Sequence, residues 1–390
     1  MSESKLIIPA IGKVLAKVET TPGTKVSLAD ADAVFFEEIE WQYESDNIQR
    51  VPLAPERHGV KSVEGPRRIT WSGSTEMALP DAYDSSAAVP HPDVWIQACG
   101  FQREDFDSVS LEASFYALAS TDHKAISFEA YEYTADGTDA DFIQARGARC
   151  NWELALVDGE RVKLTLSNGL ATEASTESQT YQASSSESKA VTYYTDKPFV
   201  VNRGNTSAEL VDISSAVPVV FGGGSQGSPA GNFQIISATF NGNMEPEEQR
   251  GLGLQRNRLA GAGPVTGTIV IEEGLLTNAS AFDPYALRRT GAALEWRCKV
   301  TQDDASGNST FFATHAYLQI VGVNHTDAGK RRVWELEVEV KYPEDPSDSN
   351  PAVGASPTQT FDFTEGTKGL YADLAVTNVG VFGICFHRTV

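Results

Sequence analysis

Apolar and polar residues alternate along much of this chain, and the alternation predicts β-strands. In the run 333–342 the apolar residues are separated by charged residues, and the run 126–133 alternates almost without fault. Successive side chains of a strand point to opposite faces, so each run predicts a strand with one buried and one wet face. Aromatic and β-branched residues in these runs favour the same structure. Further strands are expected at 34–41, 69–79, 114–119, 147–156 and 160–166.

Two short segments predict helices. In the segment 90–99, Pro92 suits a first helical turn, Asp93 suits the positive end of the helix dipole, and Gly100 suits the C-terminal cap. The segment 283–291 has the same order of signals, with Asp283 and Pro284 at its start and Gly291 at its end. We therefore expect two short helices that lie against sheets.

The predicted elements occur twice in the same order. The segments 38–41, 65–77, 92–100 and 157–166 correspond to 236–240, 263–272, 283–291 and 327–337. The separation between corresponding residues decreases along the chain, which is typical of a duplicated module whose second copy has shorter loops. Internal similarity in a constant order indicates the fold more strongly than a local motif does.

This repeat divides the chain into four expected parts. Residues 1–170 hold an N-terminal arm and the first module, and residues 232–345 hold the second module. Between them, 171–231 begins with a stretch rich in Ser, Thr and Glu and contains Gly222 to Gly224, so we expect a flexible insert there. A linker rich in Pro, Asp and Ser leads to a C-terminal extension, 346–390.

The charge of the chain restricts its possible partners. With 31 Lys and Arg against 53 Asp and Glu, the net charge is −22. Such a charge argues against a protein that grips nucleic acid through a basic surface. A wall along which DNA slides without sticking remains compatible with it. No segment is long and apolar enough for a secretory signal or a membrane span, so we expect no membrane partner.

The residues that carry catalysis or bind metals form no recognisable motif. The six histidines are scattered, the four cysteines are widely spaced, and the glycine cluster lacks the Lys-Ser/Thr ending of a phosphate loop. Neighbouring carboxylates face opposite sides of a strand and form no acid–base pair. We therefore expect no enzyme, no catalytic residue, no metal site and no cofactor, and we expect the cysteines to be buried thiols. The basic pairs Arg67-Arg68 and Arg288-Arg289 and the run 330–332 belong either to solvated turns or to contacts with a neighbouring subunit.

Several stretches, in their order, resemble the tail tube (major tail) proteins of long-tailed bacteriophages. The segment 17–24 resembles the N-terminal arm of that family, and 69–79 followed by 97–101 resembles its first sheet and helix. The segments 141–152 and 164–169 resemble a further pair of strands of that family. The segments 265–269 and 282–284 resemble second-half equivalents of the family's elements. Together these stretches cover most of residues 10–342.

The resemblance implies a mainly β fold built of tandem β-sandwich or half-open barrel modules, each with a short flanking helix. It also implies a structural virion protein that assembles in the host cytoplasm into stacked rings. The inner sheets of a ring would form a continuous β-barrel around a lumen through which DNA passes during ejection. Two modules per chain imply rings of three chains with pseudo-six-fold symmetry, and a homohexamer is the alternative. Implied partners are the tape measure and tail terminator proteins.

The strand 333–342 is our first candidate for lining that lumen. Its charged face carries Glu335, Glu337 and Glu339. Two other functions stay open. A baseplate, decoration or receptor-binding β-protein would share the strands without stacking, and a β-sandwich hydrolase would need an acid–base pair that only the fold could assemble.

Overall fold

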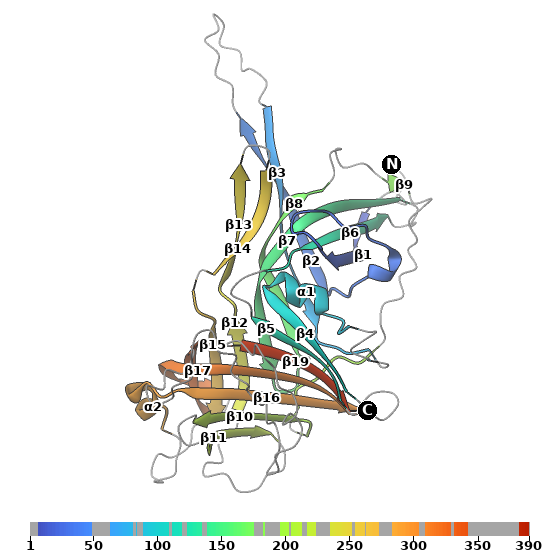
Figure 1. Ribbon diagram of the computed structural model, residues 1–390. Helices are drawn as coiled ribbons and strands as arrows, with labels where there is room; N and C mark the ends of the chain where they lie inside the picture. Colours follow the sequence, from blue (N-terminus) through green and yellow to red (C-terminus); the bar gives the residue numbers. More distant parts are fainter. Residues whose placement is uncertain are drawn as a thin grey trace, which may run out of the picture.

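The computed structural model of the chain is mainly β, as the alternation predicts (Figure 1). The structure describes residues 7–48, 63–80, 83, 89–108, 111–118, 123–134, 139–174, 182–183, 196–202, 204–212, 217–223, 235–251, 254–261, 263–272, 283–303, 309–328, 331–341 and 382–389. Within these residues, the pairings between strands are all antiparallel.

Six strands from the first half of the chain, here called the first strand set, are neighbours in one sheet. Their order in the sheet is β2 (Glu38–Ile48), β3 (Val63–Glu76), β8 (Lys163–Glu173), β7 (Asp139–Val157), β6 (Ile126–Thr134) and β1 (Ile7–Val18). The segment expected as an N-terminal arm thus supplies β1, the last strand of this set.

A second strand set from the other half of the chain repeats this order. It consists of β12 (Ile235–Asn241), β15 (Thr266–Glu272), β18 (Arg331–Val340), β17 (Ser309–Ala328), β16 (Leu294–Asp303) and β10 (Thr206–Asp212). In both sets a long strand, β7 or β17, pairs with the strand that follows it in the chain, β8 or β18. The corresponding segments found in the sequence are therefore corresponding strands in the sheet.

Both predicted helices are present. Helix α1 (Asp93–Ala98) contacts β1, β4, β6 and β7, and α2 (Pro284–Thr290) contacts β17. At the start of α2 the carboxylate of Asp283 accepts a hydrogen bond from the backbone N–H of Ala286 at 3.0 Å. Gly291 ends the helix in the left-handed conformation, with φ of 65°. The caps expected from the sequence of α2 are confirmed.

The remaining elements lie outside this common order. The hairpin of β4 (Phe101–Ser108) and β5 (Leu111–Leu118) follows α1 only, and the hairpin of β13 (Met244–Gly251) and β14 (Leu254–Gly261) lies between β12 and β15. A 3₁₀ turn (Asp30–Asp32) precedes β2. Strand β9 (Gln182–Ala183) pairs with β7, and β11 (Val217–Gly223) pairs with β10.

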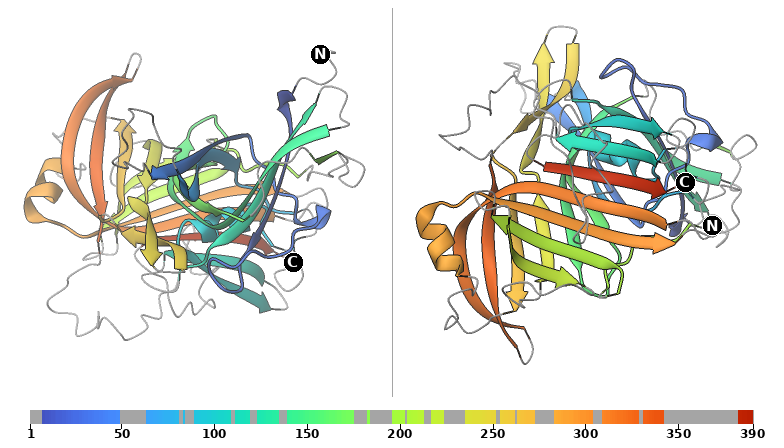
Figure 2. Two further views of the ribbon diagram at one scale, coloured as in Figure 1. Left: turned by 90° about the horizontal axis from the view of Figure 1, so that it is seen from above. Right: turned by 60° about the horizontal axis from the view of Figure 1, so that its bottom comes forward.

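The boundaries expected from the sequence do not coincide with the limits of the two strand sets, because β8 crosses the boundary at residue 170. Strands β10 and β11 both lie in the segment 171–231, and β10 pairs with β16 of the second strand set. Much of the rest of that segment lies outside the described residues, so its predicted flexibility stays a prediction. The C-terminal extension 346–390 contains β19 (Phe382–Thr389), which pairs with β5 on one edge and with β17 on the other. Figure 2 shows β19 in red between these two strands.

One hydrophobic core extends across both strand sets. The ring of Phe382 in β19 lies 4.9 Å from that of Trp152 in β7 and 5.3 Å from that of Phe240 in β12. Because aromatic rings bury large apolar areas, these contacts hold the two sets together. The four cysteines are buried and free, as expected.

His387 is a buried histidine in β19, and because of it we expect the free energy of unfolding of the chain to fall in mild acid. Burial, together with the nearby Lys299 ammonium, lowers the pKa of His387 to about 3, and the ring stacks on Phe311 with 5.0 Å between centroids. Between pH ~6.5 and ~3 the unfolded chain binds a proton here that the folded chain does not bind. The free energy of unfolding should therefore fall by a few kcal/mol over this window.

This prediction is tested by urea unfolding between pH 7.5 and 4. His387→Leu removes the titrating group from its buried position, so its stability should depend less steeply on pH than that of the wild-type chain. Equal slopes for the two proteins would contradict the assignment to His387.

Candidate assembly interface

The face of β18 that points away from the core is acidic. Glu335 and Glu339 are half-buried and Glu337 is exposed, whereas the alternate residues, Trp334 and Leu336 among them, are buried. Glu337 accepts a hydrogen bond from the Asn324 side chain at 2.9 Å. The structure therefore places the three predicted glutamates together on one wet face, and their position in a lumen stays a prediction.

This wet face continues across both strand sets. Residues directly opposite each other in neighbouring strands share a face of the sheet. One such row crosses seven strands in the order Glu38, Ser74, Thr165, Glu153, Asn241, Thr266 and Glu339. Ser74 in this row is buried, with 4 % exposed surface, and the other six residues are exposed or half-buried. Glutamates from β2, β7 and β18 thus lie in one row on the same face of the sheet, which no local sequence motif indicated.

The two strand sets meet edge to edge. The last residues of β7 pair with β12, with Leu154 opposite Phe240 and Glu153 opposite Asn241. The preceding part of β7 uses the same edge to pair with β6, and its other edge pairs with β8. Leu154 and Phe240 both have 0 % exposed surface. We call this pairing the internal junction.

Polar contacts and a close glycine hold the internal junction in register. Asn151 donates to the Asn241 side chain at 3.1 Å and accepts from the backbone N–H of Met244 at 2.9 Å. The backbone N–H of Gly242 donates to the Trp152 carbonyl at 2.9 Å. A Cβ at Gly242 would lie 2.2 Å from Nε1 of Trp152, so only glycine fits at this position.

The β13–β14 hairpin packs on the first strand set. Asn257 of β14 is buried and donates to the Gly147 carbonyl of β7 at 3.0 Å. Met244 and Leu259 are buried from the same side, close to Gly100. The second set therefore extends a hairpin over β7 and β8 of the first set in addition to joining it at the sheet edge.

The positions that form the internal junction recur on β2 and on the last part of β17, where no described strand occupies the corresponding edge. We call these the open edges. Within the described residues, β2 pairs with β3 alone, although its counterpart β12 also pairs with β7. The last part of β17 pairs with β18 alone, although its counterpart in β7 also pairs with β12. On β2 the core-facing Ile39 and Trp41 are half-buried, whereas on β12 Ala238 and Phe240 are 1 % and 0 % exposed.

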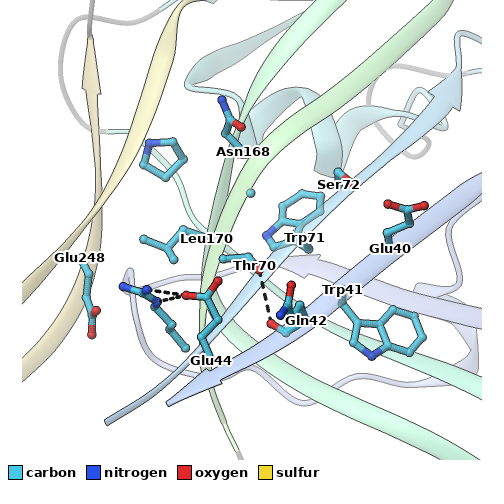
Figure 3. Close-up of a pocket in the computed structure, with 13 residues that line it drawn as sticks. Glu40, Trp41, Gln42, Glu44, Thr70, Trp71, Ser72, Asn168, Leu170 and Glu248 are labelled. Atoms are coloured by element: carbon cyan, nitrogen blue, oxygen red, sulfur yellow. Dashed lines mark hydrogen bonds and ion pairs between the residues drawn. The ribbon is translucent and has the colours of Figure 1, made fainter. Parts of the chain in front are cut away.

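A groove of ≈ 740 Å³ lies between the open β2–β3 pair and the β13–β14 hairpin (Figure 3). Glu40, Glu44 and Glu248 line it together with Trp41, and Arg68 forms an ion pair with Glu44. Its lining contains no histidine, cysteine or lysine. In the part of the chain that the structure describes, no group of three or more His, Cys, Asp or Glu residues could hold a metal ion.

The basic pairs differ in their surroundings. Arg67 and Arg68 form ion pairs within the chain, with Glu173 at 3.2 Å and with Glu44. Arg288 and Arg289 are exposed in the last turn of α2, and Arg332 is exposed at the start of β18. The sequence did not distinguish these two situations, because the partner carboxylates are distant along the chain.

Neither helix of the described residues is long and apolar enough to cross a membrane.

Comparisons with known proteins do not assign the chain to a family. No protein-family model matches the chain. A search of curated proteins finds no significant match.

Proposed function

We propose that this chain is the structural subunit of a phage-type tail tube. It consists of two tandem tube modules, each a β-sandwich or half-barrel with a flanking helix. Three chains form a pseudo-hexameric ring, and the rings stack into a hollow tube of the virion through which DNA passes.

The internal junction is the observation that carries this proposal. It joins two strand sets of the same order edge to edge, and among the described residues no second strand pairs with the same edges of β2 and of the last part of β17. A contact that joins one surface to a different surface on the next copy generates a closed ring or an open filament. Closure also protects the open edges, which would otherwise favour uncontrolled aggregation.

The arrangement of the hairpins supports stacking. Figure 1 shows the β2–β3 hairpin and the β13–β14 hairpin projecting from the same end of the molecule. In a ring, such hairpins would point along the axis and reach the next ring. The tape measure and tail terminator proteins are the further partners that this function requires.

The acidic wet face suits a wall that DNA must pass without binding. Like charges repel across a narrow aqueous channel, and the low-dielectric walls strengthen the field. Glu335, Glu337 and Glu339 of each chain would contribute to that field together with Glu38 and Glu153.

Neutralising three glutamates should lower the electrostatic barrier to DNA inside the tube. For Glu335→Gln/Glu337→Gln/Glu339→Gln we expect intact tubes that take up more short duplex DNA at low salt than wild-type tubes do, measured as the DNA that sediments with the tubes. The matched control neutralises three exposed carboxylates that lie outside β18 and outside the projecting hairpins, with Asp158→Asn, Glu160→Gln and Asp303→Asn. Equal DNA uptake by the two variants would exclude β18 as the wall.

Electron microscopy of the purified protein tests the proposal as a whole. Long hollow tubes whose end views contain three chains per ring are expected. Monomers that stay dispersed at high concentration would contradict self-assembly, and rings of six whole chains would contradict the trimer. Rings that never stack would instead indicate a baseplate or decoration protein.

A further inference from the structure

We infer that neighbouring chains join by antiparallel pairing of β2 in one chain with the last part of β17 in the next, in one defined register. This inference rests on the proposed function and names the contact through which the ring closes. In the register, Glu38 lies opposite Asn324, Ile39 opposite Val323, and Glu40 opposite Gly322.

The correspondence between the two strand sets determines this register. In and just before β8 the buried row on the core face is Val162, Leu164 and Leu166, and in β18 it is Trp334, Leu336, Val338 and Val340. Gly73 of β3 lies opposite Leu166, and the matching glycine of β15, Gly267, lies opposite Val338, so Leu164 corresponds to Leu336. Leu154 lies opposite Leu164, and Val323 lies opposite Leu336. Val323 of β17 therefore corresponds to Leu154 of β7.

A pair of glycines aligns β2 with β12. A Cβ at Gly73 of β3 would lie 2.2 Å from the Glu38 carbonyl oxygen, and a Cβ at Gly267 of β15 would lie 2.7 Å from the Thr239 carbonyl oxygen. Both glycines thus allow the same close approach of a neighbouring backbone. Gly73 lies opposite Ile39, and Gly267 lies opposite Phe240. Ile39 therefore corresponds to Phe240, and Glu38 corresponds to Thr239.

If β17 and β2 of neighbouring chains pair in the way that β7 and β12 pair within one chain, the residues opposite each other between chains follow. Phe240 lies opposite Leu154 in the internal junction, so Ile39 of one chain lies opposite Val323 of the next. Both of these apolar residues are half-buried in the single chain, and the pairing would cover them. A register shift of one residue would move every side chain of β2 to the other face, so burial of this pair selects the register.

The charges on the wet face are also compatible with this register. Glu38 and Asn324 are both exposed, and Asn324 lies opposite Glu335 on its other side. The uncharged amide of Asn324 would therefore lie between the carboxylates of Glu38 and Glu335 across the contact. No pair of like charges lies directly opposite in it, which would otherwise destabilise the ladder.

The hydrogen-bond pattern of the internal junction shows which pair suits a disulfide. The Asp158 N–H donates to the Ile236 carbonyl at 3.3 Å, and the Gly242 N–H donates to the Trp152 carbonyl at 2.9 Å. Hydrogen-bonded pairs alternate with non-hydrogen-bonded ones, so Thr239 and Ala155 form a non-hydrogen-bonded pair. Their counterparts Glu38 and Asn324 would have Cα atoms about 4.5 Å apart, within the range that a disulfide spans.

Disulfide trapping tests the register. The variant Glu38→Cys/Asn324→Cys is assembled, oxidised briefly with copper–phenanthroline and run on a non-reducing denaturing gel. We expect a ladder of cross-linked chains that ends at three and collapses to monomer on reduction. The native cysteines are buried, so the oxidised wild-type protein should stay monomeric on the gel.

Two controls define the contact. Glu40→Cys/Thr326→Cys places cysteines on the same two strands but four residues, or roughly 13 Å, out of register, and at least tenfold less cross-linking is expected. An equal mixture of the single variants Glu38→Cys and Asn324→Cys should give dimers and nothing larger. Each single variant alone should give monomers, because the contact joins two different edges.

The outcomes separate this inference from the proposed function. If the control pair cross-links and Glu38→Cys/Asn324→Cys does not, in preparations that contain tubes, the register is wrong and the function stands. If neither pair cross-links in such tubes, the inferred register is likewise overturned and the function stands. A ladder that continues past three chains would overturn closure by three. If microscopy finds neither rings nor tubes, the proposed function fails, and the inference fails with it.

Discussion

Ile39→Glu is expected to abolish rings and tubes while leaving the single chain folded. In the single chain Ile39 is half-buried on the open edge of β2, so a glutamate there keeps access to water. In the proposed contact the same carboxylate would be covered opposite Val323 of the next chain. Burying an unpaired charge costs several kcal/mol or forces it to take up a proton. The proposed ring would contain three such contacts, so assembly should fail at every one.

Sedimentation and electron microscopy measure this effect, and circular dichroism checks that the variant stays folded. Val89→Glu is the matched control, because Val89 is 44 % exposed and lies outside both strand sets. We expect normal tubes from the control. Normal tubes from Ile39→Glu would show that the open edge of β2 is not a contact between chains.

Phe240→Ala should lower the free energy of unfolding of the single chain by about 3–5 kcal/mol. Phe240 has no exposed surface. Its ring lies 5.7 Å from that of Trp296 and 5.3 Å from that of Phe382, and its backbone pairs with Leu154. Removing it leaves a cavity where the two strand sets and β19 meet.

The matched variant is Ile39→Ala, because Ile39 is the counterpart of Phe240 at an open edge. In the single chain it should cost about 1 kcal/mol, since the side chain is already half-exposed and loses less buried area. In the assembly it should raise the protein concentration needed for tubes. Urea unfolding of the unassembled chains measures the first effect, and sedimentation measures the second. Equal destabilisation by the two variants in the single chain would contradict the distinction between the internal junction and the open edge.

The local pattern of the sequence predicted the elements that local physics determines. Alternation in the run 333–342 predicted β18 with its acidic face, because side chains alternate across any strand. Asp283 and Gly291 predicted the ends of α2, since a cap depends only on its own neighbours. The repeated order of segments likewise appears as the repeated order of strands.

The pairing partners of several strands could not be predicted in this way. Strand β19 lies between β5 and β17, more than 260 residues from one and more than 50 from the other along the chain. Strand β10, in a segment expected to be a flexible insert, pairs with β16. Periodicity describes which face of a strand is buried, but it contains no information on which distant strand completes the ladder.

By itself, the sequence determined that this protein is mainly β, that its elements occur twice, and that Glu335, Glu337 and Glu339 share one face. Those features depend on spacing and residue type along a short stretch of chain. Only the tertiary structure decided that β12 joins β7 edge to edge and that Phe240 is buried there while Ile39 stays half-exposed. The physical reason is that an edge is open or closed according to its neighbours in space, and identical local patterns occur at both kinds of edge.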